Sequence, residues 1–253
     1  MSFRLFFFAI IILMSKPLII LNWKMNPARP SEAAKLFKAT VASASAKLNL
    51  VVAPPFIYLS ELNKIKSGIQ LGAQDISSET AGAFTGEISG LMLKNQGVKY
   101  VLVGHSERRW LIGESDDLIA AKLSASLRAG FKTVLCVGEL KQVSKAQAWS
   151  FIAKQIKRGL ADVPEDKFKN LIVAYEPVWA IGNGHTATLE HSSFIAAEIK
   201  ALLGDKTPVL YGGSVDVTNI KSFLNSPDFT GVLVGGASLK VPSVKKILHL
   251  FLK

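Results

Sequence analysis

Reactive side chains end two apolar runs of this sequence. Lys24 stands in the peptide NWKMN at 22–26, and Glu176 stands in AYEPVWAIG at 174–182. A positioned carboxylate can remove a proton from carbon, and a nearby cation can stabilise the negative charge that forms on oxygen. The two peptides therefore indicate a proton-transfer enzyme, with a solvent-exposed strand-end carboxylate as the simpler alternative for Glu176.

A histidine and two glycine pairs add to this set. His105 precedes Ser106, and a helix beginning there would favour a neutral imidazole that can donate a proton. Gly235-Gly236 and the Gly212-Gly213 pair before Ser214 have no side chain to keep an oxyanion away from backbone N–H groups. These segments predict a phosphate site. Alternatively, the glycines only form tight turns and the histidine is an ordinary hydrogen-bonded residue.

The elements that must position these residues alternate regularly along the chain. Near-continuous apolar runs, typical of parallel strands buried on both faces, are predicted as strands at 18–22, 48–53, 69–74, 100–104, 133–137, 171–175, 209–211 and 231–234. Amphipathic stretches separate them. One begins at Ser115 as N-cap and ends before Gly130, and the last has Pro242 in its first turn.

Eight strand-helix units without a linker predict an α/β protein with one closed (β/α)₈ barrel over residues 15–253. A doubly wound open sheet is the runner-up, because periodicity alone does not distinguish the two. In a barrel, active sites form on the loops after the strands. The polar residues at those ends are Asn22, Lys24, Gln74, His105, Glu139, Glu176, Ser214, Gly235 and Gly236.

Composition narrows the class of protein. The chain has 253 residues, 49% of them hydrophobic and 19% charged, which favours a core-forming domain over disorder. Its net charge is +11, but the basic residues are spread along the whole length, so nucleic-acid binding is not expected. Basic charge would instead raise the encounter rate with a small anionic substrate. The single cysteine, Cys136, excludes an intrachain disulfide, offers no metal cluster and suits a cytoplasmic location.

The first fourteen residues are an apolar extension of doubtful status. The run from Leu5 to Leu13 is shorter than the roughly 18 residues that a membrane-spanning helix needs, so no stable membrane insertion is expected. The segment resembles the apolar part of a signal peptide but lacks a small-residue cleavage site. A misassigned start with Met14 as the true one, a functionless extension, a weak anchor and an export signal all remain open.

The segment after Glu176 is interpreted as a lid. Residues 182–187 superficially fit the dinucleotide fingerprint G-x-G-x-x-A, but the predicted strand ends six residues earlier, and the fingerprint must follow a strand directly. A loop bounded by proline and glycine can instead close over a phosphate and exclude water. The lid comprises Pro177, Val178, Trp179, Ala180, Ile181, Gly182, Asn183, Gly184, His185, Thr186 and Ala187.

Six peptides together resemble the triosephosphate isomerase family. They are NWKMN at 22–26, GHSERR at 104–109, CVGE at 136–139, AYEPVWAIG at 174–182, YGGSV at 211–215 and LVGGASL at 233–239. The resemblance extends from about Ser15 to the C-terminus. It implies a (β/α)₈ barrel that interconverts dihydroxyacetone phosphate and glyceraldehyde 3-phosphate, a step of glycolysis and gluconeogenesis, without a cofactor or metal.

The resemblance also implies a role for each matching residue. Glu176 matches the catalytic base, His105 the electrophile and Lys24 the cation beside the oxyanion. Glu107 matches a carboxylate that lies near the lysine without contacting the substrate, and the neighbouring Ser106 matches a residue of the same supporting group. Asn22, Lys24, Gly182, Ser214, Gly235 and Gly236 match the substrate-binding residues. Thr85, in the loop 82–87, matches a residue that inserts into a second subunit, so a homodimer is implied.

Three positions depart from the family pattern. Asn183-Gly184-His185 stands where Thr-Gly-Lys is usual, Asp75 replaces an asparagine, and Thr230 replaces an aspartate before the eighth strand. The first leaves the opening rate of the lid in question. The other two could lower the stability of the dimer or the barrel without abolishing the chemistry. Two rival functions are an isomerase of larger sugar phosphates, which needs a different base, and a barrel scaffold without catalysis.

Overall fold

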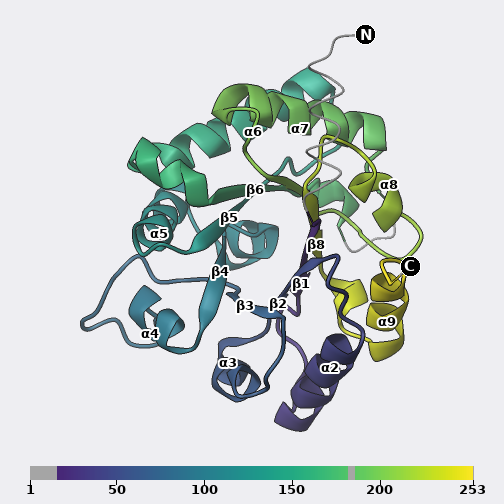
Figure 1. The fold of residues 1–253 in the computed structure, drawn as a ribbon. Coiled ribbons are helices and arrows are strands. Elements are labelled where there is room, and N and C mark those ends of the chain that lie inside the picture. Colours follow the sequence, from purple (N-terminus) through teal and green to yellow (C-terminus); the bar gives the residue numbers. More distant parts are fainter. Residues whose placement is uncertain (1–15, 182–185, 253) are drawn as a thin grey trace.

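The computed structural model describes residues 16–181 and 186–252, and over these it shows a closed barrel of eight parallel strands (Figure 1). The strands are β1 (Leu18–Asn22), β2 (Asn49–Ala53), β3 (Gln70–Ala73), β4 (Val98–Val103), β5 (Lys132–Val137), β6 (Leu171–Tyr175), β7 (Val209–Tyr211) and β8 (Gly231–Val234). β1 pairs with β2 on one side and with β8 on the other, which closes the ring. The (β/α)₈ prediction is confirmed, and the open-sheet alternative is wrong.

Four of the predicted strands, at 18–22, 171–175, 209–211 and 231–234, have the predicted bounds, and the other four differ by one or two residues at their ends. β4 ends at Val103, one residue early, because Gly104 has a φ of +71°, which lies outside the extended region. β2 begins at Asn49 because the Leu48 N–H donates to the Ser45 carbonyl within the preceding turn. The proposed boundary at 14/15 lies outside the described residues.

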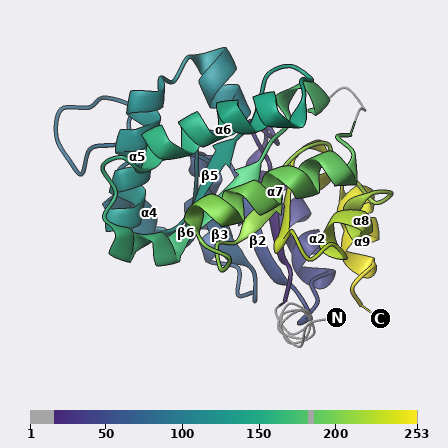
Figure 2. The ribbon, with the colours of Figure 1, turned by 90° about the horizontal axis from the view of Figure 1, so that it is seen from above.

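Helices surround the barrel on its outer side (Figure 2). The α-helices are α2 (Pro30–Ala42), α3 (Phe56–Asn63), α4 (Gly90–Asn95), α5 (Asp116–Arg128), α6 (Lys145–Leu160), α7 (Leu189–Leu203), α8 (Ile220–Leu224) and α9 (Val241–His249). A π-helix, η1 (Arg108–Ile112), and three 3₁₀ turns, η2 (Glu165–Asn170), η3 (Val178–Ala180) and η4 (Gly236–Ser238), complete the set.

The helix signals identified in the sequence are confirmed where they were predicted. The Ser115 hydroxyl accepts the N–H of Leu118 as N-cap of α5, and Gly130 follows that helix with a φ of +83°. Pro242 lies in the first turn of α9. None of the helices in the described part of the chain is long and apolar enough to cross a membrane.

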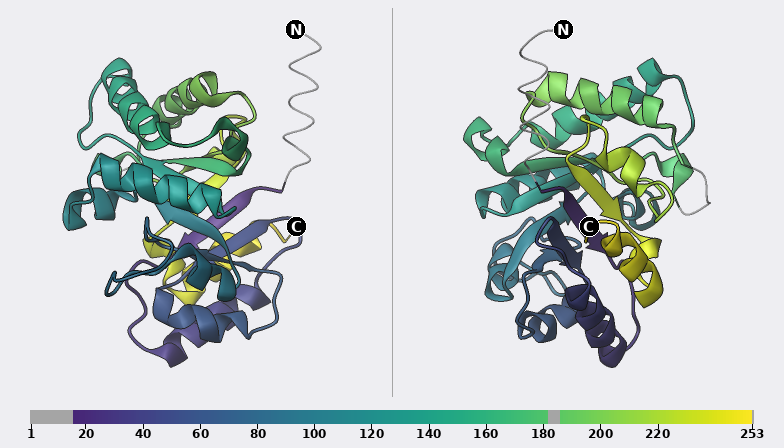
Figure 3. Two further views of the ribbon diagram at one scale, coloured as in Figure 1. Left: turned by 90° about the vertical axis from the view of Figure 1, so that its left-hand side faces the viewer. Right: turned by 45° about the vertical axis from the view of Figure 1, so that its right-hand side comes forward.

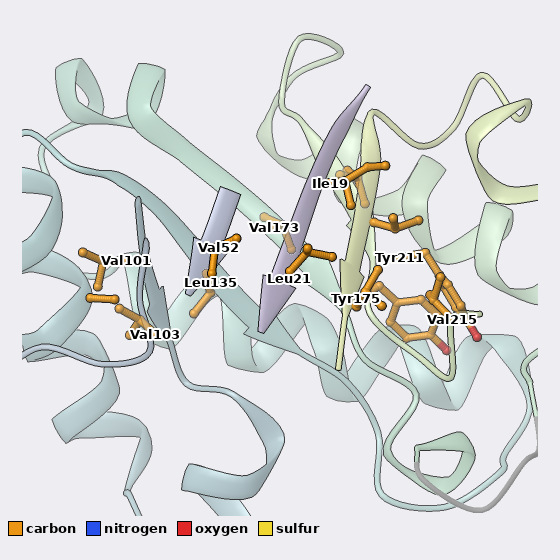
Figure 4. Packing of buried hydrophobic residues seen from close by; sticks show 14 of the residues in the cluster. Ile19, Leu21, Val52, Val101, Val103, Leu135, Val173, Tyr175, Tyr211 and Val215 are labelled. Atoms are coloured by element: carbon orange, nitrogen blue, oxygen red, sulfur yellow. The ribbon is translucent and has the colours of Figure 1, made fainter. Parts of the chain in front are cut away.

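Two apolar layers hold the barrel together. Inward-facing residues of the strands fill its interior, among them Ile20, Val134 and Cys136. The alternate residues, such as Ile19, Leu135 and Val173, point outward and pack under the helices (Figure 4). Burial on both faces explains why the strands are near-continuous apolar runs in the sequence. Because all eight strands are parallel, their carboxyl ends lie at one mouth of the barrel (Figure 3).

Candidate active site

Lys24 is held in an uncommon backbone conformation just beyond β1. Its φ is +53°, the only positive value for a non-glycine residue in the described parts, and such a conformation costs on the order of 1–3 kcal/mol. Two hydrogen bonds offset this cost. The Lys24 N–H donates to Oδ1 of Asn22 over 2.9 Å, and Nε2 of Gln74 donates to the Lys24 carbonyl over 2.7 Å. Asn22 and Gln74 thus hold the Lys24 backbone in place, and with it the point from which the lysine side chain extends.

The Lys24 ammonium pairs with a carboxylate from the loop after β4. Its Nζ donates to Oε1 of Glu107 over 2.6 Å, and Oε2 of the same carboxylate lies 3.6 Å from Nδ1 of His105. Glu107 therefore lies between the cation and the imidazole.

His105 directly follows the left-handed Gly104, and one helical turn begins at the next residue, Ser106. The backbone N–H of Glu107 donates to Nδ1 of His105 over 3.3 Å. An imidazole that accepts at Nδ1 carries its proton on Nε2 when it is neutral. That Nε2 lies 3.4 Å from Oε1 of Glu176, so the ring presents a donor toward the predicted base.

Glu176 lies directly after β6 and is almost completely buried. Its Oε2 accepts the N–H of Ser106 over 2.9 Å, while Oε1 has no hydrogen-bond partner among the described residues. One oxygen is thus anchored, and the other keeps its lone pairs available for a proton. Behind it, burial and the charge of Glu176 raise the pKa of the Cys136 thiol well above its ordinary value, so this buried cysteine stays protonated.

A cavity of about 280 Å³, just below the usual range for ligand sites, opens beside Asn22, Lys24 and His105. Its lining includes Asn22, Lys24, His105, Ile181, Gly212, Gly213, Ser214, Val215, Asp216, Leu233, Gly235, Gly236 and Ala237. A larger cavity of about 420 Å³ lies beside Trp179 and His191. We place the active site in the smaller cavity, because only there do the predicted cation, imidazole and glycines meet.

Two glycines of the site, Gly212 and Gly235, lie where a Cβ would come too close to a neighbouring side chain. A Cβ on Gly235 would lie 2.9 Å from Cε of Lys24, and a Cβ on Gly212 would lie 2.9 Å from Cγ of Glu176. Nothing lies within 4 Å of the equivalent position at Gly236, which faces open space. Ser214 donates its hydroxyl to the Ala180 carbonyl over 2.5 Å and so connects the β7 loop to η3.

The comparisons with known proteins agree with this geometry. The family model described as triosephosphate isomerase matches residues 17–251. A triosephosphate isomerase from Idiomarina loihiensis is 44% identical over 239 residues, covering 88% of this chain and 93% of that relative. Another, from Thermoanaerobacter pseudethanolicus, is 42% identical over 248 residues, covering 93% and 100%. The chain belongs to the triosephosphate isomerase family. As a member of it, the protein is an isomerase.

Most residues that the likeness to triosephosphate isomerase singled out lie together. Asn22, Lys24, His105, Ser214, Gly235 and Gly236 line the cavity, with Glu107, Ser106 and Glu176 in contact with its groups. Thr85 lies elsewhere, in an exposed loop. Gly182 and the lid residues 183–185 lie outside the described residues, so the lid stays a prediction. Across residues 16–181 and 186–252, no three His, Cys, Asp or Glu side chains are arranged to hold a metal ion.

Three of the polar strand-end residues do not line the cavity: Glu176 lies behind His105, whose Nε2 is 3.4 Å from its Oε1, and the other two are Gln74 and Glu139. Gln74 supports the Lys24 backbone instead, and Glu139 is buried beneath Trp179. Conversely, the lining residue Asp216 was not predicted, although it directly follows the peptide YGGSV of the family pattern, whereas Ile181 was predicted as part of the lid. Gly138 was also missed as a site residue. A Cβ there would lie 1.7 Å from the carbonyl oxygen of Glu176, and the peptide CVGE was the signal for it.

Two of the departures from the triosephosphate isomerase pattern, Asp75 and Thr230, lie in the described part of the chain and make specific contacts there. Asp75 is buried, and its Oδ2 pairs with Nζ of Lys122 at 2.7 Å and with a guanidinium nitrogen of Arg108 at 2.9 Å. Both cations also pair with Glu114. Thr230 donates its hydroxyl to the Val209 carbonyl over 3.1 Å, within the barrel.

Proposed function

We propose that the protein interconverts dihydroxyacetone phosphate and D-glyceraldehyde 3-phosphate through an enediolate, with Glu176 as the base. The carboxylate takes a proton from the alcohol carbon next to the carbonyl and returns it to the former carbonyl carbon. The alcohol carbon thereby becomes the new carbonyl, and the former carbonyl becomes an alcohol. The single observation that carries this proposal is the orientation of Glu176. Its Oε1, which has no hydrogen-bond partner among the described residues, lies 3.4 Å from Nε2 of His105, a residue that lines the cavity.

His105 and Lys24 are proposed to handle the charge on the two substrate oxygens. The N–H at Nε2 of a neutral His105 can donate to one oxygen and move a proton between the two as the carbonyl changes place. The Lys24 ammonium stabilises the negative charge that builds up on oxygen. Its pairing with Glu107 keeps the ammonium at a fixed position before the substrate arrives, so little reorganisation is needed during the reaction.

The phosphate is proposed to bind the backbone N–H groups of the last two loops. Gly235 and Gly236 follow β8 without a side chain between their backbone and the cavity, and Ser214 follows β7. These two loops are the common phosphate site of (β/α)₈ barrels. A volume of about 280 Å³ favours a three-carbon phosphate over a larger sugar phosphate.

The test is isomerase activity of the purified chain. Dihydroxyacetone phosphate is supplied, and aldehyde formation is followed through a coupled dehydrogenase, alongside Glu176→Gln and a six-carbon ketose phosphate as the competing substrate. We expect aldehyde from the wild type with the three-carbon substrate and a loss of about a hundredfold or more in the variant. No reaction with dihydroxyacetone phosphate, or faster turnover of the larger sugar, contradicts the proposal.

We further propose that two copies of the chain form a homodimer through the first half of the barrel. Among the described residues, the most exposed large hydrophobic side chains lie in the first four strand-helix units, led by Met25, Leu111, Ile57 and Leu91 at 93%, 80%, 79% and 67%. The loop before α4, which carries Thr85, extends away from the body of the molecule (Figures 1 and 2). Exposed large hydrophobic side chains of this kind are typical of an interface between protein chains.

A cytoplasmic location and a role in glycolysis and gluconeogenesis complete the proposal. The lone, buried Cys136 is compatible with a reducing compartment. Fractionation of the source cells, with the isomerase activity followed across fractions, tests the location. Recovery of the activity outside the cytoplasmic fraction contradicts it.

A further inference from the structure

A buried carboxylate anchors the segment that leaves Glu176. Glu139 follows β5, and its Oε1 accepts the Tyr175 hydroxyl over 3.0 Å and the indole N–H of Trp179 over 2.7 Å. Trp179 lies in η3, three residues beyond Glu176, and η3 leads to Ile181 in the wall of the active-site cavity. The position of the indole therefore depends on where the Glu139 carboxylate is held.

Glu139 has one candidate counter-charge. Within the described residues, the only basic side chain at ion-pair distance is His191, whose Nε2 lies 3.7 Å from Oε1. That nitrogen and the second oxygen of Glu139, Oε2, are both buried, and neither has a hydrogen-bond partner among the described residues. A buried carboxylate is costly unless it is paired and hydrogen-bonded, so these two atoms complement each other.

The surroundings of His191 leave Glu139 as the anion it faces most closely. Its ring stacks on Tyr175 of β6, with centroids 6.4 Å apart. Burial raises the pKa of the Tyr175 hydroxyl far above its ordinary value, so this residue stays neutral. Glu190, the preceding residue in α7, is exposed and pairs with Lys145 of α6 at 2.5 Å. The cavity of about 420 Å³ beside His191 and Trp179 gives the imidazole room to turn toward Glu139.

We propose that His191 is a positioning residue for the isomerase: its protonated imidazole donates from Nε2 to Glu139 and fixes the carboxylate that holds the Trp179 indole. No group transfer is involved. When the imidazole loses its proton, Glu139 loses its only cation within the described residues, and the hold on Trp179 weakens. The link to turnover rests on the proposed function, whereas the link between His191 and Trp179 does not.

The direct readout is the indole N–H signal of Trp179 in a nitrogen-15 correlation spectrum, followed between about pH 5 and 8, where imidazoles titrate. In the wild type we expect this signal to shift with an imidazole titration. His191→Gln, whose amide can donate to Glu139 but carries no titrating charge, is expected to abolish that shift. The matched control is His249→Gln in α9, an exposed histidine whose Nδ1 bonds to the Lys245 carbonyl of the same helix, and this variant should preserve the shift.

Two further measurements keep the proposal open to refutation. In Glu139→Gln the Trp179 signal should also lose its pH response, because the partner charge is gone. The kcat of the wild type relative to His191→Gln should fall by about threefold as the pH rises through the imidazole titration. A Trp179 signal that titrates alike in wild type and His191→Gln, or one that does not shift in the wild type, overturns the proposal. An inactive wild type would overturn the proposed function instead and leave the spectroscopic test intact.

Discussion

At the scale of single residues, the position of Glu176 depends on neighbours that have no side chain. Gly212 lies against its Cγ and Gly138 against its backbone carbonyl, while the Ser106 N–H holds Oε2. The side chain is therefore confined on several sides, and a shift of one neighbour is transmitted to the carboxylate. In proton transfer a displacement of about 1 Å can reduce turnover by two orders of magnitude.

Gly212→Ala tests this confinement. The added methyl group would lie 2.9 Å from Cγ of Glu176, so the carboxylate must move, and we expect kcat to fall by about tenfold or more. Gly68→Ala is the matched control, because nothing lies within 4 Å of the methyl group there. Steady-state kinetics with dihydroxyacetone phosphate gives the comparison, and equal kcat values for the two variants would show that Gly212 does not position the base.

The sequence predicted most of the residues that lie together at the mouth of the barrel. It predicted fewer of the contacts that each of them makes. The peptides around Lys24, His105 and Glu176 identified the site. The outward turn of Glu139 beneath Trp179 was not predictable, since side chains at strand ends face inward or outward according to loop geometry that the apolar pattern does not encode. The same holds for the left-handed backbone of Lys24.

At the scale of elements, a cluster of four buried or half-buried charges joins the loop after β3, the π-helix η1 and α5. Asp75 and Glu114 supply the carboxylates, and Arg108 and Lys122 supply the cations. Arg108 directly follows Glu107, the partner of Lys24, so the cluster also supports the catalytic loop. Neither η1 nor this cluster was predicted, because both depend on contacts between residues distant in the sequence.

The two carboxylates of the cluster are expected to respond oppositely to substitution. Burial raises the pKa of Asp75, and the bond from Lys122 only partly offsets it. Burial alone would also raise the pKa of Glu114, but bonds from Arg108 and Lys122 outweigh it and lower the value. We expect Asp75→Asn to increase the free energy of unfolding at neutral pH and Glu114→Gln to decrease it by about 3 kcal/mol.

Denaturant unfolding at several pH values measures both effects at a fixed protein concentration. The contribution of Asp75 to stability decreases as the pH rises from its ordinary pKa of 3.8 through its raised value, because the unfolded chain loses that proton first. The contribution of Glu114 is present above its ordinary pKa of 4.5 and is lost as the pH falls below it through the lowered value. Destabilisation of similar size in both variants at neutral pH would refute the assigned signs.

At the scale of the whole molecule, the apolar runs in the sequence predicted eight parallel strands buried on both faces. They did not predict that the sheet closes into a barrel. Closure depends on the pairing of β1 with β8, between residues more than 200 positions apart. The local pattern of apolar residues does not indicate which distant strands pair, which is why an open sheet was the alternative prediction. The count of eight units and the family likeness favoured the barrel.

The proposed dimer is tested by light scattering. The wild type should have the mass of two chains at micromolar concentration, because association would cover the apolar side chains of the first four units. Leu91→Glu places a charge in α4, beside the loop that carries Thr85, and is expected to give single chains. Leu202→Glu in α7, on another part of the surface, serves as control and should stay dimeric. A wild type of single-chain mass would rule out the dimer.

The central claim is that Glu176 transfers the proton while the loops after β7 and β8 bind the phosphate. The decisive measurement compares Glu176→Asp with the wild type for turnover of dihydroxyacetone phosphate and for inhibition by inorganic phosphate. Shortening the side chain moves the carboxylate by about one bond, so we expect kcat to fall about a hundredfold while the inhibition constant stays within about twofold. Unchanged turnover, or an equal loss of turnover and phosphate affinity, would contradict the role assigned to Glu176.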